Sequence, residues 1–145
     1  METKEKLSLD LKVAGAVFVL VFVVYLFTLC PGIYVGPSAE AVCDVKGAGL
    51  TPPISHPVWL VLGRFFALFS SNTAYMLNFM SALFGALTIA RMYLILSQFV
   101  HGRTAEEEAR YQTQPFLRQV AAISASLLVA FSYPFWEGSV LAGSD

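Results

Sequence analysis

The sequence predicts an all-α integral membrane protein with three transmembrane helices and a short interfacial helix in the first external loop. Two observations predict this fold class. The 145-residue chain is 57% hydrophobic and only 13% charged, whereas soluble domains carry about 25% charged residues. Long apolar stretches alternate with polar segments, and most basic residues lie in two of those segments, as expected for a chain that crosses a bilayer.

The first apolar stretch, residues 13–30, contains no charged residue. A helix of this length spans roughly 27 Å at 1.5 Å per residue, which is close to the hydrocarbon thickness of a membrane. A cleaved signal peptide is the competing interpretation, because Ala39-Glu40-Ala41 fits an A-x-A cleavage pattern. The stretch is longer than the apolar region of most signal peptides, and the triplet lies well beyond its end, so a spanning helix is favoured.

Two further apolar stretches, residues 73–99 and 120–136, are predicted to span the membrane. Arg91 is the one charge in the first of them, near an end from which its side chain can snorkel to the interface. The other carries Pro134 and an aromatic belt near its end. Candidate capping residues stand at the start of 73–99: Ser71, Asn72 and Thr73.

Residues 57–69 are apolar apart from Arg64 at their middle. About a dozen residues reach only roughly 20 Å, and a central arginine would lie at the most costly depth. We therefore predict a helix that lies at the membrane interface or re-enters the membrane without crossing it.

The positions of the basic residues predict the orientation. Three crossings place residues 1–12 and 100–119 on one side of the membrane, and residues 31–72 and 137–145 on the other. The first side holds six basic residues: Lys4, Lys6, Lys12, Arg103, Arg110 and Arg118. The second holds only Lys46 and Arg64. The positive-inside rule then places the N-terminus in the cytoplasm.

Small residues recur four apart on the second and third spans, as in Ala82 and Ala86 or Ala122 and Ser126. Such pairs let helix backbones approach inside lipid. We interpret them as ordinary helix packing. No basic patch indicates nucleic-acid binding, and two histidines with two separated cysteines do not favour a structural zinc site.

The external segment 31–72 carries the polar residues closest to the membrane. Glu40 and Asp44 would share one face of a helix, because they are four residues apart. A carboxylate here can act as a general base or hold a divalent cation. Cys30 and Cys43 fall on the oxidising side, where they either form a disulfide or stay apart, with Cys30 buried at the end of the helix.

The order of short motifs resembles a large bacterial family of multi-spanning proteins similar to protein O-mannosyltransferases, of the GT-C glycosyltransferase class. The most similar run is Asn78 followed by Ser81-Ala82-Leu83-Phe84-Gly85-Ala86. The other matching elements are Thr28-Leu29 with Pro31-Gly32, Ser38-Ala39-Glu40, Pro52-Pro53 with His56-Pro57, Leu62-Gly63-Arg64, and Phe131-Ser132 with Phe135-Trp136.

The resemblance implies a bacterial inner membrane protein that transfers a sugar from a polyprenyl-phosphate donor to an acceptor on the extracytoplasmic face. It implies Glu40 as the catalytic carboxylate and a substrate-binding role for Arg64, His56 and Ser38, with basic residues holding the donor phosphate. A divalent cation is a possible aid in this family, and no residue is assigned to a metal. The family's loop aspartate is Pro37 in this chain, which leaves catalysis open.

Two hypotheses therefore stay open. The chain is the N-terminal part of a glycosyltransferase, or it is a non-catalytic membrane scaffold that binds other helices or subunits. Three helices are fewer than a complete GT-C enzyme needs, so we expect a piece of a longer protein or a shortened relative. A transporter or channel is not favoured, because no charged residue lies in the middle of a predicted span.

Overall fold

The structure is a computed structural model that describes residues 2–33, 37–47, 57–101 and 115–141. In these ranges every regular element is a helix, which confirms the predicted all-α class. The helices are α1 (Glu2–Phe27), α2 (Pro37–Lys46), α3 (Pro57–Ala67), α4 (Thr73–His101), α6 (Pro115–Ala130) and α7 (Tyr133–Val140).

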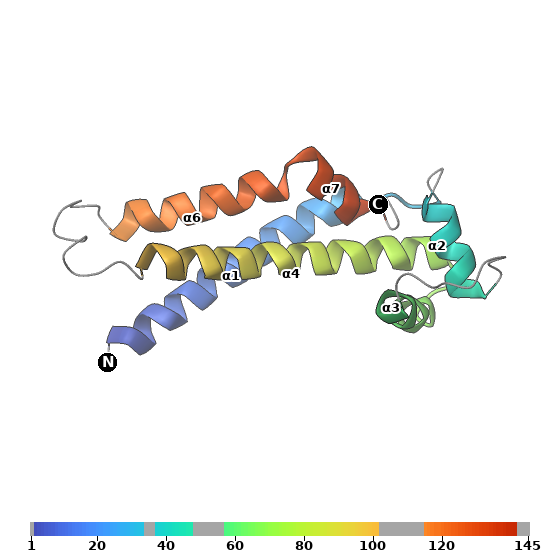
Figure 1. Ribbon diagram of the computed structural model, residues 1–145, viewed down its shortest axis with the longest axis horizontal. Helices are drawn as coiled ribbons and strands as arrows, with labels where there is room; N and C mark the ends of the chain where they lie inside the picture. The colour runs from blue at the N-terminus through green and yellow to red at the C-terminus, as the bar shows by residue number, and fades with distance from the viewer. Residues whose placement is uncertain (1, 34–36, 48–56, 102–114, 142–145) are drawn as a thin grey trace.

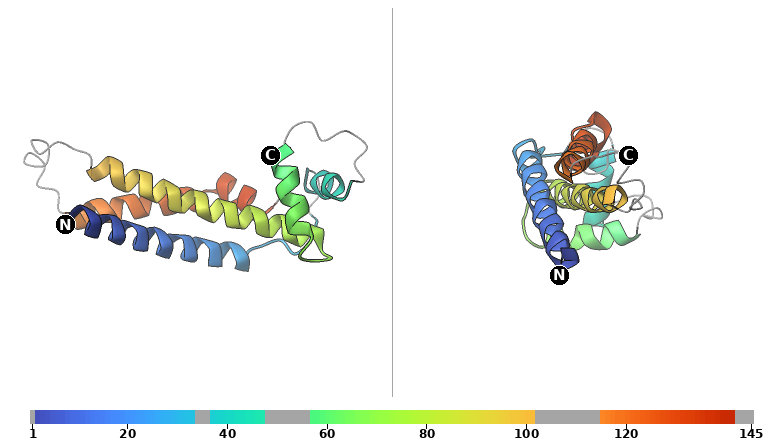
Figure 2. Two further views of the ribbon diagram at one scale, coloured as in Figure 1. Left: turned by 90° about the horizontal axis from the view of Figure 1, so that it is seen from below. Right: turned by 90° about the vertical axis from the view of Figure 1, so that its left-hand side faces the viewer.

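Three long helices, α1, α4 and α6, lie side by side, and α4 is the centre of the bundle (Figure 1). It contacts each of the other described helices. α1 and α6 run in one direction and α4 in the other, so α1 and α6 begin at the end of the bundle where α4 finishes. α2 and α3 lie crosswise to the long helices at the opposite end (Figures 1 and 2).

Among the described helices, two are long and apolar enough to cross a membrane. The apolar part of α1 covers Ser8–Phe27 with a mean hydropathy of 2.2, and that of α4 covers Thr73–Phe99 with 1.7. The first span was predicted to start at residue 13, whereas α1 begins at Glu2. The polar N-terminal residues extend the helix beyond its apolar part. At the start of α4 the backbone N–H of Tyr75 donates to the side-chain oxygen of Asn72 at 3.1 Å, so Asn72 is the cap among the three candidates.

The third predicted span is not one straight helix, which corrects the prediction of a continuous segment over 120–136. α6 ends at Ala130, α7 begins at Tyr133, and their axes differ by 63°. Pro134 explains the break, because it has no N–H to donate to the carbonyl of Ala130 and its ring would clash with that carbonyl in a continuous helix. Counted as one bent span, the pair brings the candidate spans to three.

The crosswise helices differ from the prediction in two details. α2 was not predicted as a helix. It ends at Lys46, and the next residue, Gly47, has a φ of 74°, the left-handed conformation common after helix ends. α3 ends at Ala67, two residues before the predicted boundary, and Leu68 and Phe69 form tighter turns with bonds to residues three back. Whether α3 lies at a membrane interface stays a prediction.

The core of the bundle follows the small residues of α4. Ala82 and Ala86 are fully buried and pack in one cluster with Val21 and Tyr25 of α1. Their lack of bulk lets α1 approach α4 closely, which is how small residues act in membrane helices. On α6, Ala122 and Ser126 are likewise buried. The packing role predicted for these pairs is confirmed.

Candidate functional site at the α2–α3 end of the bundle

α2 separates its buried side chains from its exposed ones. Ser38, Val42 and Val45 are buried at helical spacing, and the two valines pack on α3 and α4. Glu40 is exposed in the first turn of the same helix, where the free N–H groups of a helix end favour a negative charge. Ser38, a predicted substrate-binding residue, therefore faces the protein interior, and Glu40 faces outward.

The exposed face of α3 is apolar, with one positive charge. Val58, Val61 and Phe65 are 71%, 66% and 54% exposed, and Arg64 is exposed on the same helix. An apolar outward face with a single arginine is typical of a helix that lies in the membrane interface, where the guanidinium can reach phosphate groups.

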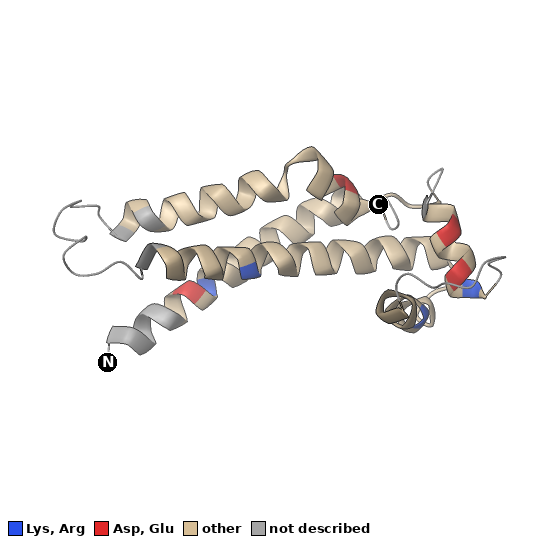
Figure 3. Cartoon of the chain, viewed as in Figure 1, with Lys and Arg blue, Asp and Glu red and all other residues tan. Residues whose placement is uncertain are grey.

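The charged residues of the described ranges lie in two groups along the bundle, with an uncharged stretch between them (Figure 3). One group is on α2, α3 and α7, and by sequence it includes Glu40 of α2 and Arg64 of α3. α2 and α3 contact one another, but within the described part of the chain Glu40 and Arg64 form no ion pair. Each charge is left available at the surface. The fourth predicted site residue, His56, lies outside the described residues.

In the described part of the chain, neither a metal-binding cluster nor a disulfide is formed. Among the described residues no group of three or more His, Cys, Asp and Glu side chains could hold a metal ion. Cys30 and Cys43 are both free thiols, so the disulfide alternative is not realised. The Cys30 thiol instead donates to the carbonyl of Gly32 at 3.5 Å.

Two asparagines of α4 hold the segment that leads from α1 towards α2. The buried side-chain amide of Asn78 donates to the carbonyls of Cys30 at 2.8 Å and Gly32 at 3.3 Å. Asn72 donates to the carbonyl of Pro31 at 3.3 Å. These bonds satisfy backbone carbonyls that no helix pairs. Asn78 and Pro31-Gly32 belong to the motifs that carry the resemblance, and the structure gives them a joint positioning role.

The break between α6 and α7 is tied to α1. The hydroxyl of Tyr25 donates to the carbonyl of Ala130 at 2.7 Å, and both residues are fully buried. This is the carbonyl that Pro134 leaves without its usual helical donor. The indole N–H of Trp136 donates to the hydroxyl of Thr28 at 3.2 Å. Neither bond was predicted from the sequence, because no local pattern signals a bond between residues more than one hundred positions apart.

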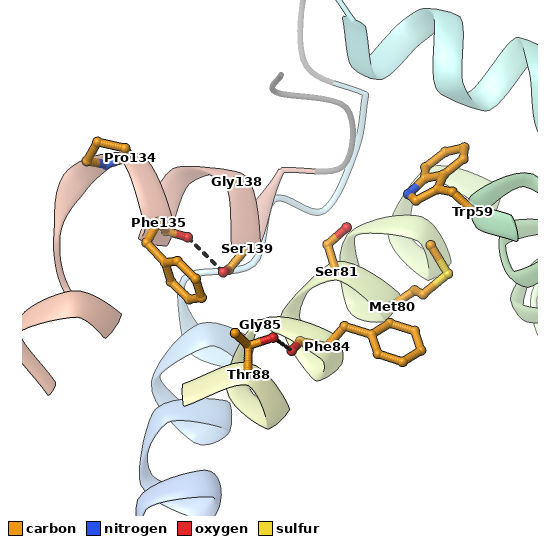
Figure 4. A pocket seen from close by; sticks show the side chains of 10 residues that line it. All are labelled: Trp59, Met80, Ser81, Phe84, Gly85, Thr88, Pro134, Phe135, Gly138 and Ser139. Carbon is orange, nitrogen blue, oxygen red and sulfur yellow. Dashed lines mark hydrogen bonds between the residues drawn. The ribbon is translucent and has the colours of Figure 1, made fainter. Parts of the chain in front are cut away.

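A pocket of about 380 Å³ opens between α3, α4 and α7 (Figure 4). The 63° bend of α7 away from α6 accompanies it. Aromatic side chains from each helix line the pocket, and small residues of α4 and α7 lie between them. The aromatic residues are Trp59, Phe84 and Phe135, and the small ones include Ser81, Gly85, Gly138 and Ser139. Its volume is within the range of small-molecule sites.

Comparison with known proteins identifies the family. The family described as "Protein O-mannosyl-transferase TMEM260 N-terminal domain" matches residues 45–143, which is more than half of the chain. No curated protein and no solved structure matches the chain. The match includes Arg64 and all of α3, α4, α6 and α7, whereas Ser38 and Glu40 precede it. The resemblance drawn from the motifs is confirmed, and the chain belongs to the family of the N-terminal domain of the protein O-mannosyl-transferase TMEM260.

Proposed function

We propose that this chain is the N-terminal part of a membrane glycosyltransferase that takes mannose from a polyprenyl-phosphate donor and transfers it on the extracytoplasmic face. The observation that carries the proposal is the exposed carboxylate of Glu40, at the end of the bundle where α2 and α3 lie crosswise. An acceptor hydroxyl is a poor nucleophile until it loses its proton, and a positioned carboxylate can accept that proton.

The distribution of basic residues supports the orientation. The end where α1 and α6 begin carries the N-terminal lysines in its sequence, and the α2–α3 end carries only Lys46 and Arg64. By the positive-inside rule, the α2–α3 end faces outward and the N-terminus lies in the cytoplasm. In this proposal the membrane is the bacterial inner membrane, and α6 with α7 forms the third, bent span.

Arg64 supports the choice of donor. Its guanidinium is exposed on a helix whose outward face is apolar, so a lipid phosphate and an arginine can meet at the same depth. Arginine binds phosphate in a planar, bidentate geometry that lysine cannot reproduce. In the proposed reaction Glu40 accepts the acceptor's proton, and Arg64 stabilises the negative charge on the departing polyprenyl phosphate.

The test is transfer of radiolabelled mannose from polyprenyl-phosphate mannose into membrane protein by the full-length protein. Glu40→Gln should lower transfer by about 10²-fold or more, the usual contribution of a general base. Its folded yield should be unchanged because Glu40 is exposed. Asp44→Asn, one turn further along α2, is the matched control and should retain transfer.

Two outcomes would decide against the proposal. Transfer by Glu40→Gln at the rate of the original protein would remove Glu40 from the mechanism. Absence of transfer in the original, folded protein would favour the scaffold hypothesis, in which the domain binds other helices or subunits. Arg64→Lys should recover only part of the activity that Arg64→Ala loses, if the phosphate is bound by the guanidinium fork.

A further inference from the structure

Gly63 is a buried residue near the middle of α3. Glycine destabilises the interior of a helix relative to alanine, so a glycine at this position needs a reason in the packing. A Cβ added to Gly63 would lie 2.9 Å from Cγ2 of Val45 on α2 and 3.0 Å from Cδ2 of Leu77 on α4. Gly63 therefore lies at a junction of three helices that a larger side chain would force apart.

The contact with Val45 is the closer and the less adaptable of the two. Leu77 presents the far end of a flexible side chain, which can move by rotation about its own bonds. Valine has one strongly preferred rotamer in a helix, so a clash with Val45 displaces the backbone of α2. Because two carbon atoms prefer a separation of about 3.5–4.0 Å, a Cβ at 2.9 Å would move α2 and α3 apart by roughly 0.6–1.1 Å.

The two helices that meet at Gly63 carry the two charged side chains of the proposed reaction. Arg64 follows Gly63 directly on α3, and Glu40 precedes Val45 by five residues on α2. No ion pair joins these charges within the described ranges, so their spacing depends on how the two helices pack. α2 and α3 contact one another and α4, and they lie crosswise to the long helices (Figure 1).

We propose that Gly63 is a positioning residue for sugar transfer. The lack of a side chain at this position sets the separation of α2 and α3, and thereby the spacing of Glu40 and Arg64. The inference rests on the proposed function for the roles of these two side chains. A misplacement of about 1 Å can cost as much as about 10²-fold in rate, because reacting groups must be held within a narrow range of geometry.

The first test is the rate of mannose transfer by the full-length protein, expressed per folded protein. Gly63→Ala should lower kcat by about tenfold or more, while KM for polyprenyl-phosphate mannose should stay within about twofold because Arg64 stays exposed on α3. Val45→Ala removes the methyl group that the new Cβ would meet. The double variant Gly63→Ala/Val45→Ala should therefore recover kcat to within about threefold of the original.

Two further variants complete the test. Val45→Leu reaches one carbon further towards Gly63 and should also lower kcat, which keeps the test sound if Gly63→Ala does not fold. Ala122→Val is the matched control for packing alone. Ala122 is buried with Ala14 and Tyr93, towards the end where α1 and α6 begin, so added bulk there strains the fold without separating α2 from α3. Its kcat per folded protein should stay within about twofold.

The second test measures the spacing of α2 and α3 without sugar transfer. Spin labels are attached to the native Cys43 and to Val61→Cys, both at exposed positions, in a full-length protein without its other cysteines. Double electron–electron resonance then gives their separation. Gly63→Ala should shift the mean distance by about 1 Å, and the added Val45→Ala change should restore it.

Four results would overturn the inference. Three concern kcat per folded protein: a value for Gly63→Ala equal to the original, an equal fall in Ala122→Val, or no recovery in the double variant. The fourth is an unchanged label distance in Gly63→Ala. If the original protein transferred no mannose while the distance responded as expected, the proposed function would fail, and the role of Gly63 in spacing α2 and α3 would stand.

Discussion

Replacing Tyr25 by phenylalanine removes one oxygen from the bundle and leaves its volume almost unchanged. That oxygen donates to the carbonyl of Ala130 at 2.7 Å, and both residues are fully buried. The carbonyl has no second donor of the usual kind, because the residue four positions later is Pro134. Tyr25→Phe therefore leaves a buried acceptor without a partner.

Two kinds of measurement bound the loss of stability expected for Tyr25→Phe. A buried polar group left without a partner costs about 1–3 kcal/mol, whereas hydrogen bonds between membrane helices average about 0.6 and reach about 1.7 kcal/mol. Because the backbone break gives this carbonyl no alternative donor, we expect a loss of about 1–2 kcal/mol in the free energy of unfolding. In a Pro134→Ala background an N–H becomes available to the carbonyl, and the loss should shrink by about 1 kcal/mol.

The assay is reversible unfolding in mixed micelles by titration with SDS, followed by circular dichroism. Tyr75→Phe is the control, since Tyr75 lies on the exposed face of α4 and its change should cost under about 0.5 kcal/mol. Equal stability of Tyr25→Phe and Tyr75→Phe would refute the reasoning. So would an unchanged cost of Tyr25→Phe in the Pro134→Ala background.

Two further predictions concern packing, and the same titration measures both. Asn78→Ala should destabilise the fold by about 1–3 kcal/mol, because the two carbonyls that follow α1 lose their donor; a change under about 0.5 kcal/mol would contradict this. Gly85→Ala should destabilise by about 1–3 kcal/mol, because its Cβ would lie 2.9 Å from that of Ser139. Gly15→Ala, where a Cβ meets nothing within 4 Å, should instead be neutral or stabilising by up to about 1 kcal/mol; the two glycines behaving alike would be the contrary result.

The spans were predictable because their signal is local. Residues 73–99 contain one charge, and the apolar part of α4 ends where the composition changes. The packing role of the small-residue pairs on α4 could also be predicted from the sequence, since helical spacing places Ala82 and Ala86 on one face. The break in the third span had a local cause in Pro134, which the prediction placed near the end of one helix instead of at the start of another.

The site was less predictable, because it depends on contacts between distant segments. The polar composition of residues 37–46 hid α2, whose buried face consists of Ser38, Val42 and Val45. The exposure of Glu40 and the burial of Ser38 follow from how that helix packs on α3 and α4, and two residues in one short motif end on opposite faces. The pocket depends on a bend angle, which the sequence does not encode in any single motif.

The central claim is that the α2–α3 end of the bundle lies outside the cytoplasm, and the native cysteines offer its most direct test. Cys43 is free and exposed on α2, so a Cys30→Ala variant carries one reporter thiol in the described part of the chain. In intact cells a membrane-impermeant maleimide should label Cys43. A cysteine introduced at Thr104, in a variant without Cys30 and Cys43, should react only after the membrane is opened. Labelling of the Thr104→Cys variant in intact cells, with Cys43 spared, would contradict the account.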